Sequence, residues 1–299
     1  PLEVNKCERR DCTRYGEHGV FGVLRSACKK AEGRLGPSAA FHYFCHLKHD
    51  YPMKEQHLFY APEIALTGTL PADESAHAGR VLRMRTGDSL WAMDGLGRFY
   101  DAEITEASPR ACVVEVTGSR PERPTHRGSI RLAVAPTKNA DRMEWLAEKV
   151  TETGIDALHF VLCRNSERKV LKDERINRIV ISAAKQSHKA TLPQVESLCP
   201  LMQFLKDEAN RPGQKLIAHC LDMGEGDDAT ASAAPHLADI IEADADTVVL
   251  IGPEGDFAPD EVAEALRLGW QAISLGPCRL RTETAALAAA TLMAAGKRL

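Results

Sequence analysis

Long apolar segments are missing from this sequence. No run of about 18 or more apolar residues occurs in it, the length at which a membrane-spanning helix is suspected. The hydrophobic fraction of 44% and the charged fraction of 27% are those of an ordinary globular protein. The given sequence also opens without a basic segment followed by an apolar one, so it predicts no secretory signal. We therefore expect a cytosolic protein without a membrane partner.

Cysteine pairs with the spacing of a zinc site are missing as well. The nine cysteines are an odd number scattered along the chain, which favours reduced thiols over a disulfide framework. Cys7 and Cys12 are five positions apart, and the chain contains no CxxC pair. His42, His46 and His49 stand close together, but they add no zinc pattern. We interpret residues 1–52 as a poorly structured extension or a misplaced start site, and we expect no metal.

The sequence also lacks an excess of basic residues. The net charge of −4 argues against a protein that coats nucleic acid by bulk electrostatics. It does not exclude a local basic face, because single faces of a protein can differ in charge from the whole.

The length and the changes of pattern predict two domains. Residues 53–119 are β-rich, and the proline-bearing segment 120–128 is typical of a linker. Strands are expected over residues 57–60, 89–94, 97–104 and 111–116. A helix is expected over residues 74–84, ended by Gly87.

From residue 129 to residue 299, strands and helices alternate, which predicts a mostly parallel α/β sheet. The expected strands are 130–136, 157–163, 215–221, 247–252 and 271–276. The expected helices are 139–154, 174–189, 261–269 and 282–299. The pattern alone favours an unknotted, doubly wound sheet.

Three glycine-bearing loops follow predicted strands in the last third of the chain: HCLDMGEG, GPEGDF and GPCRLRTETA. Ligands of open parallel sheets bind beyond the carboxyl ends of the strands, so these loops are candidate walls of a pocket. The phosphate-binding patterns GxxxxGK[ST] and GxGxxG are absent. Glu254, Asp256 and Glu283 would repel a triphosphate, whereas a cationic adenosyl sulfonium would be attracted. GPEG taken alone is equally explained by an ordinary strand-to-helix turn.

The helix after GPEGDF has a weak start. Pro259 suits the first helical position, but Ala258 then occupies the N-cap, where Ser or Asp normally accepts a backbone N–H. We therefore expect other contacts to hold this loop.

Six motifs together resemble one family. IGPEGDFAPDE (251–261) followed by LGPCRLRTETAALAA (275–289) resembles the ribosomal RNA small subunit methyltransferase E family. The segments HAGRVLRMRTGD, LAEKVTETGID, RNSERKV and AAKQSHKATLP resemble its other motifs, in the same order. The resemblance covers residues 54–299.

The resemblance implies a fold and a function. The fold is α/β: a SPOUT-type, trefoil-knotted parallel sheet domain at 129–299, preceded by a small PUA-like β-barrel that binds RNA at 53–119. The function is methylation of uridine N3 in 16S rRNA, at uridine 1498, with S-adenosyl-L-methionine as cofactor. The partners are 16S rRNA or the assembled small ribosomal subunit, and a second copy of the chain in a homodimer.

The resemblance also carries over site residues. The cofactor positions are His219, Leu221, Gly252, Pro253, Glu254, Gly255, Leu275, Gly276, Leu280, Arg281, Thr282, Thr284 and Ala285. Arg281 is the candidate to stabilise negative charge on a uracil carbonyl, and Glu283 the candidate to accept the N3 proton. An Arg281–Glu283 pair that only braces the loop is the alternative. Departures from residues common in the family are Asp256, Ala258, Cys278, Arg279, Lys185 and Lys189.

Basic and polar residues beside predicted helices are candidates for RNA contact. They are Arg83, Arg85, Lys138, Arg142, Arg164, Arg168, Lys185, Gln186 and Lys189, with Arg123, Arg127 and His188 in addition. For each one alone, a solvated surface charge is the simpler interpretation. Two other functions stay open: a methyltransferase for another RNA position or a ribose, and an idle RNA-binding or assembly protein.

Overall fold

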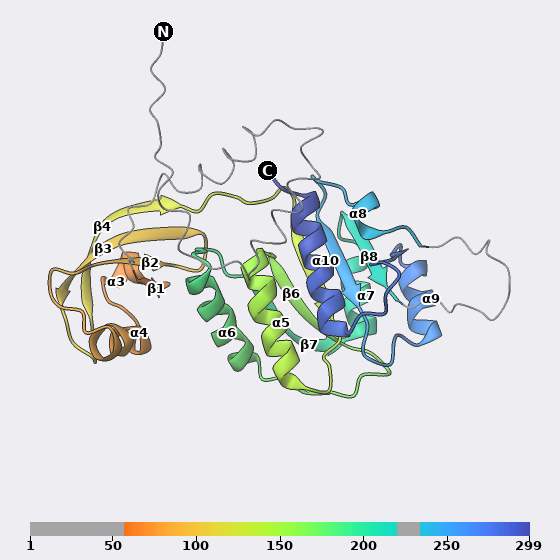
Figure 1. The fold of residues 1–299 in the computed structure, drawn as a ribbon, viewed down its shortest axis with the longest axis horizontal. Helices are drawn as coiled ribbons and strands as arrows, with labels where there is room; N and C mark the ends of the chain where they lie inside the picture. Colours follow the sequence, from red (N-terminus) through yellow and green to blue (C-terminus); the bar gives the residue numbers. More distant parts are fainter. Residues whose placement is uncertain (1–56, 220–233) are drawn as a thin grey trace, which may run out of the picture. The chain divides into compact units, whose positions relative to one another are not determined.

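The computed structural model describes residues 57–219 and 234–299. The predicted extension 1–52 and the candidate Leu221 lie outside these residues. The segment Gln56–Leu299 forms one compact unit. Its described part contains a four-stranded sheet and a six-stranded sheet (Figure 1).

The four-stranded sheet has the order β1-β2-β3-β4. Its strands are β1 (Leu58–Tyr60), β2 (Ser89–Met93), β3 (Arg98–Glu106) and β4 (Val113–Pro121). All four predicted strands of this region are confirmed. β4 continues through Pro121, so the strand includes the first residues of the segment that we expected to be irregular. Alternate side chains of the sheet pack with Ile64 and Ala78 of the neighbouring helical segments.

The predicted helix 74–84 is only partly correct. The chain is helical from α4 (Ala72–Ala76) through the π-helical η1 (His77–Val81), and it ends before Gly87. Arg83 leaves the helix in the left-handed conformation, with φ 55°, and Met84 N donates to Ala78 O at 3.0 Å. Gly87 N instead donates to Ile104 O at 2.8 Å. An arginine therefore takes the position where the sequence favoured glycine. A short helix, α3 (Ile64–Thr67), precedes α4.

The six-stranded sheet is parallel throughout, with the order β10-β8-β9-β5-β6-β7, and this confirms the predicted α/β class. Its strands are β5 (Ile130–Val134), β6 (Ala157–Leu162), β7 (Gln194–Pro200), β8 (Gln214–Ala218), β9 (Thr247–Ile251) and β10 (Gln271–Ile273). The accompanying helices are α5 (Ala140–Thr153), α6 (Asp173–Gln186), α7 (Leu201–Ala209), α8 (Leu237–Ile240), α9 (Pro259–Arg267) and α10 (Thr282–Gly296). β7, α7 and α8 were not predicted from the sequence. The knot stays a prediction.

The central strands are buried on both faces, which explains their unbroken apolar runs. Ile130, Leu132 and Val134 of β5 pack on one side, where α5, α6 and α10 lie (Figure 1). Ala133 packs on the opposite side with residues of α7 and α9. Helices therefore cover both faces of the central strands.

One polar cluster is buried beneath α7. Arg131 Nη1 of β5 lies 2.7 Å from Glu208 Oε1 of α7, and the exposed fractions of the two residues are 9% and 2%. His159 of β6 lies beside this pair. Its ring contacts Phe204 at 5.3 Å between centroids, and its Nε2 is buried without a hydrogen-bond partner in the described chain.

The burial of His159 predicts a pH-dependent stability. Removal from water lowers the pKa of His159; the negative Glu208 opposes this shift, and the positive Arg131 adds to it as a smaller cause. The unfolded chain then binds a proton more readily than the folded one. The stability that the neutral ring provides is complete above the ordinary pKa of about 6.5 and is lost as the pH falls below it. Urea unfolding at pH 7.5 and 5.5 should show a smaller loss of unfolding free energy for His159→Phe than for wild type; equal losses would contradict this role.

None of the helices within residues 57–219 and 234–299 has the length and apolar character needed to cross a membrane.

Candidate active site

The loop after β9 begins at a position that only glycine fits. A Cβ on Gly252 would lie 2.8 Å from the ring of Phe257, which is buried. Thr282 Oγ1, at the start of α10, donates to Gly252 O at 3.1 Å. This hydrogen bond ties the loop after β9 to the loop after β10, which are far apart in the sequence. The glycine and the buried hydroxyl therefore hold the two loops together.

Side chains from elsewhere fix the rest of the loop. Asn165 Nδ2 donates to the carbonyl oxygens of Gly255 at 3.2 Å and Asp256 at 3.1 Å. The buried Glu261 accepts from Ala258 N at 2.9 Å and from Arg164 N at 2.8 Å. Glu261 thus reaches back to the N-cap of α9, as in half of a capping box. The expectation that other contacts compensate for Ala258 is confirmed.

Asp256 explains one departure from the family pattern. Its φ of 58° lies in the left-handed region, where glycine is common and aspartate is tolerated better than most residues. Its own Oδ1 accepts from Phe257 N at 2.8 Å. Asp256 thus takes, with the help of this hydrogen bond, a backbone conformation that glycine adopts readily.

The loop after β10 leaves open space. Gly276 has a φ of 118°, and no atom lies within 4 Å of the position where a Cβ would stand. Leu275 and Leu280 are half-buried on either side of it. His219 follows β8 at the same edge of the sheet and is also half-buried. A ligand can approach this backbone closely, as expected for the wall of a pocket.

Arg142 joins two of the acidic residues. Its Nη1 lies 3.0 Å from Glu254 Oε1, and its Nε lies 3.5 Å from Glu283 Oε1. Glu283 is only 7% exposed, and its Oε2 has no hydrogen-bond partner among residues 57–219 and 234–299. Arg142 was predicted as an RNA contact, but the structure places it between the β9 loop and the start of α10. A buried carboxylate oxygen without a hydrogen-bond donor in the protein indicates a position where a ligand can supply that donor.

Arg281 and Glu283 line one cavity of about 340 Å³, together with Asp141, Arg142, Trp145 and Thr284. In the described structure it is Arg142 that pairs with Glu283, while Arg281 is exposed. Trp145, which is 42% exposed on the cavity wall, was not among the predicted site residues. A large aromatic residue outside the inward face of Met143, Leu146 and Val150 was the available signal.

Most of the other candidate RNA contacts are engaged by the protein itself. Lys185 Nζ lies 2.6 Å from Oε1 of the buried Glu74 and above the Phe59 ring, so it joins α6 to α4. Arg164 forms an ion pair with Asp260, Lys138 with Glu167 at 3.0 Å, and Arg127 with Asp244 at 3.5 Å. Arg168 Nε donates to Thr137 O and Lys138 O, each at 3.1 Å. Their charges are therefore less available for contact with RNA phosphate groups than the sequence suggested.

Among the candidate RNA contacts, Arg83, Arg85, Arg123 and Lys189 form no ion pair within residues 57–219 and 234–299. Gln186 is exposed at the end of α6, and the His188 ring contacts Trp91. Groups of three or more metal-ligating side chains do not occur within the described ranges.

The comparisons with known proteins agree with this architecture. Residues 124–294 match the family described as an RNA methyltransferase domain, and residues 70–117 match an RNA methyltransferase PUA domain. The chain is thus an RNA methyltransferase with a PUA domain in front of its parallel sheet. Ribosomal RNA small subunit methyltransferase E of Mycobacterium bovis is 31% identical over 248 residues, which cover 78% of this chain and 88% of the relative. The chain belongs to the ribosomal RNA small subunit methyltransferase E family.

Solved structures show the same fold. A probable rRNA-methyltransferase from Porphyromonas gingivalis is 42% identical, with a TM-score of 0.71 over 78% of this chain and 94% of that one. The ribosomal RNA small subunit methyltransferase E of Neisseria gonorrhoeae, bound to S-adenosyl methionine, is 29% identical. Its TM-score is 0.66 over 80% of this chain and 96% of that one.

Proposed function

We propose that this chain transfers a methyl group from S-adenosyl-L-methionine to N3 of a uridine in the 16S rRNA of the small ribosomal subunit, uridine 1498. Family membership and the cofactor in the Neisseria relative support the reaction class. The observation that carries the proposal is the buried Glu283 carboxylate, whose Oε2 lacks a donor beside Arg142 and Arg281.

The loops after β9 and β10 fit the cofactor. Gly276 leaves space beside its backbone, and Gly252 allows the tight turn against Phe257. Glu254 and Asp256 supply negative charge near a ligand whose sulfonium is positive. Once bound, S-adenosylmethionine supplies the electrophilic methyl group. We expect the loop positions 252–255 and 275–285, with His219, to hold it.

The cavity residues supply what the uridine needs. N3 of uracil carries a proton and is then a poor nucleophile, so a base must take this proton as the methyl group arrives. Glu283 Oε2 is the acceptor in this proposal, and Arg142 holds the other oxygen, Oε1, in place. Arg281 is exposed at the same cavity and stabilises the negative charge that develops on a uracil carbonyl.

RNA contact in this proposal uses the side chains without internal partners. Trp145 offers an exposed ring to a splayed-out base. Arg83 and Arg85, both exposed, offer charge to phosphate groups. Lys185 is left out, because its ammonium is bound by Glu74. We expect the reaction to occur in the cytoplasm, and the homodimer stays a prediction.

The test is methyl transfer from labelled S-adenosylmethionine to small subunits that lack native base methylation, followed by mapping of the modified nucleotide. We expect a single N3-methyluridine, and no label on subunits that already carry it. Label on another nucleotide or on a ribose would contradict the proposed specificity. Cofactor binding without transfer to subunits or naked 16S rRNA would favour an RNA-binding or assembly protein.

A further inference from the structure

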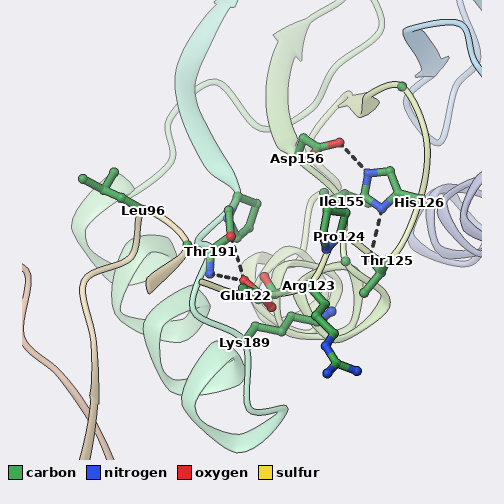
Figure 2. A pocket seen from close by; sticks show the side chains of 15 residues that line it. Leu96, Glu122, Arg123, Pro124, Thr125, His126, Ile155, Asp156, Lys189 and Thr191 are labelled. Carbon is green, nitrogen blue, oxygen red and sulfur yellow. Dashed lines mark hydrogen bonds and ion pairs between the residues drawn. The ribbon is translucent and has the colours of Figure 1, made fainter. Parts of the chain in front are cut away.

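A second cavity, of about 440 Å³, lies at the segment that follows β4 (Figure 2). It is lined by residues of this segment, by the end of α5 and by the residues between α6 and β7. Pro124 is exposed in it, the buried Ile155 and Pro193 line it from within, and Arg123 and Lys189 give it positive charge. Its volume lies in the range of sites for small organic ligands, about 300–1,000 Å³, and exceeds the needs of a bare phosphate.

The carboxylates of this cavity are already bound by the protein. Glu122 Oε2 accepts from Ala190 N at 3.0 Å, and from the N and Oγ1 atoms of Thr191, each at 2.7 Å. Asp156 Oδ2 accepts from Ile130 N at 2.6 Å and lies 2.9 Å from His126 Nε2 (Figure 2). Their donors hold both acids in fixed positions. They are therefore poorly placed to bind a cation.

The two cations, in contrast, keep unused donors. Neither Lys189 Nζ nor the Arg123 guanidinium has a hydrogen bond or ion pair to any residue of the described chain. Lys189 is half-buried, and a Cβ on Gly154 would lie 2.9 Å from its Nζ, so the ammonium is held over the end of α5. His188, directly before it, adopts the left-handed conformation with φ 54°. Such a backbone conformation is costly for a non-glycine residue.

We propose that this cavity is a second RNA site, which takes one nucleotide of the substrate strand with its phosphate at Lys189 and Arg123. The ammonium and the guanidinium match a phosphate, and the exposed ring of Pro124 offers an apolar face to a base or sugar. The inference rests on the proposed function, because RNA is the substrate there.

The position of the cavity fits a strand that continues from the target uridine. Arg142 and Trp145 lie in the first turns of α5, whereas Thr151 and Gly154 lie at its end. From Arg142 to Gly154 the helix rises about 18 Å. The two cavities are therefore separated along α5 by a distance that a few nucleotides span.

The test compares Lys189→Ala, Arg123→Ala and the double variant with wild type. Lys206→Ala is the matched control, because it removes an exposed lysine of α7 from outside both cavities. With unmethylated small subunits, we expect each single variant to raise KM about tenfold with kcat little changed. The slope of log KM against the logarithm of the salt concentration should decrease by about 0.7 for each phosphate contact that is lost. Lys189→Arg should restore most of the affinity, and Lys206→Ala should match wild type.

Equilibrium binding of a 16S rRNA fragment separates this inference from the proposed function. Should wild type bind RNA but transfer no methyl group, a tenfold weaker Kd for the variants would still support the site. An unchanged KM and Kd in the double variant would overturn it. If Lys189→Ala lowers Tm and cofactor affinity along with RNA affinity, Lys189 stabilises the end of α5 and does not bind RNA. Competition by uridine monophosphate as strong as that by the RNA fragment would also overturn a site for an RNA strand.

Discussion

Glu283→Gln is expected to lower kcat by about 10²- to 10⁴-fold, the usual contribution of a positioned general base. The amide keeps the size of the side chain and its oxygen can still lie beside Arg142, but the group no longer takes the N3 proton. The affinity for S-adenosylmethionine should stay within about twofold of wild type, because the change leaves the loops after β9 and β10 intact. Single-turnover transfer to unmethylated small subunits measures the effect apart from product release.

The control for this prediction is Glu264→Gln, the same chemical change on the outer part of α9. Glu264 pairs with Arg267 at 2.6 Å and lies outside the cavity, so wild-type kcat is expected. Undiminished transfer by Glu283→Gln would remove it as the base. If cofactor affinity and Tm fall together with kcat, Glu283 acts instead as a brace for Arg142.

The sequence alone predicts the elements with strong local patterns. The run TVVLI is buried on both faces as β9, and GPEGDF after it forms the expected loop, because the glycine requirement and the apolar run are local properties. β7 was missed for a physical reason. It lies at the edge of the sheet, and none of its residues is fully buried, so no alternation of apolar and polar residues marks it.

The pairings within the site could not be predicted in this way. Glu283 and Arg281 are close in sequence, so a pair between them was one of the two alternatives, whereas the structure supplies Arg142 from the start of α5. Lys185 appeared free for RNA, yet its partner Glu74 is 111 positions away. Ion pairs between distant segments depend on how the helices pack on the sheet, and a single sequence contains no signal for that packing.

Arg131→Ala is expected to lower the free energy of unfolding by about 3–5 kcal/mol, because it leaves the Glu208 carboxylate buried without its main partner. This loss of stability comes from leaving the buried Glu208 carboxylate unpaired rather than from the strength of the ion pair itself. Arg211 lies 3.4 Å from the same Glu208 oxygen, but its side chain is 56% exposed. Arg211→Ala is therefore the matched control, with an expected loss below about 1 kcal/mol.

A double variant distinguishes the two origins of this cost. Arg131→Met combined with Glu208→Leu removes both charges and fills the space beneath α7 with apolar side chains next to Phe204 and Trp270. If desolvation dominates, the double variant regains most of the stability lost in Arg131→Ala, and it can equal wild type. Urea unfolding of wild type, both single variants and the double variant provides the comparison. A double variant as unstable as Arg131→Ala would show that the ion pair itself, through its fixed geometry between β5 and α7, stabilises this face of the sheet.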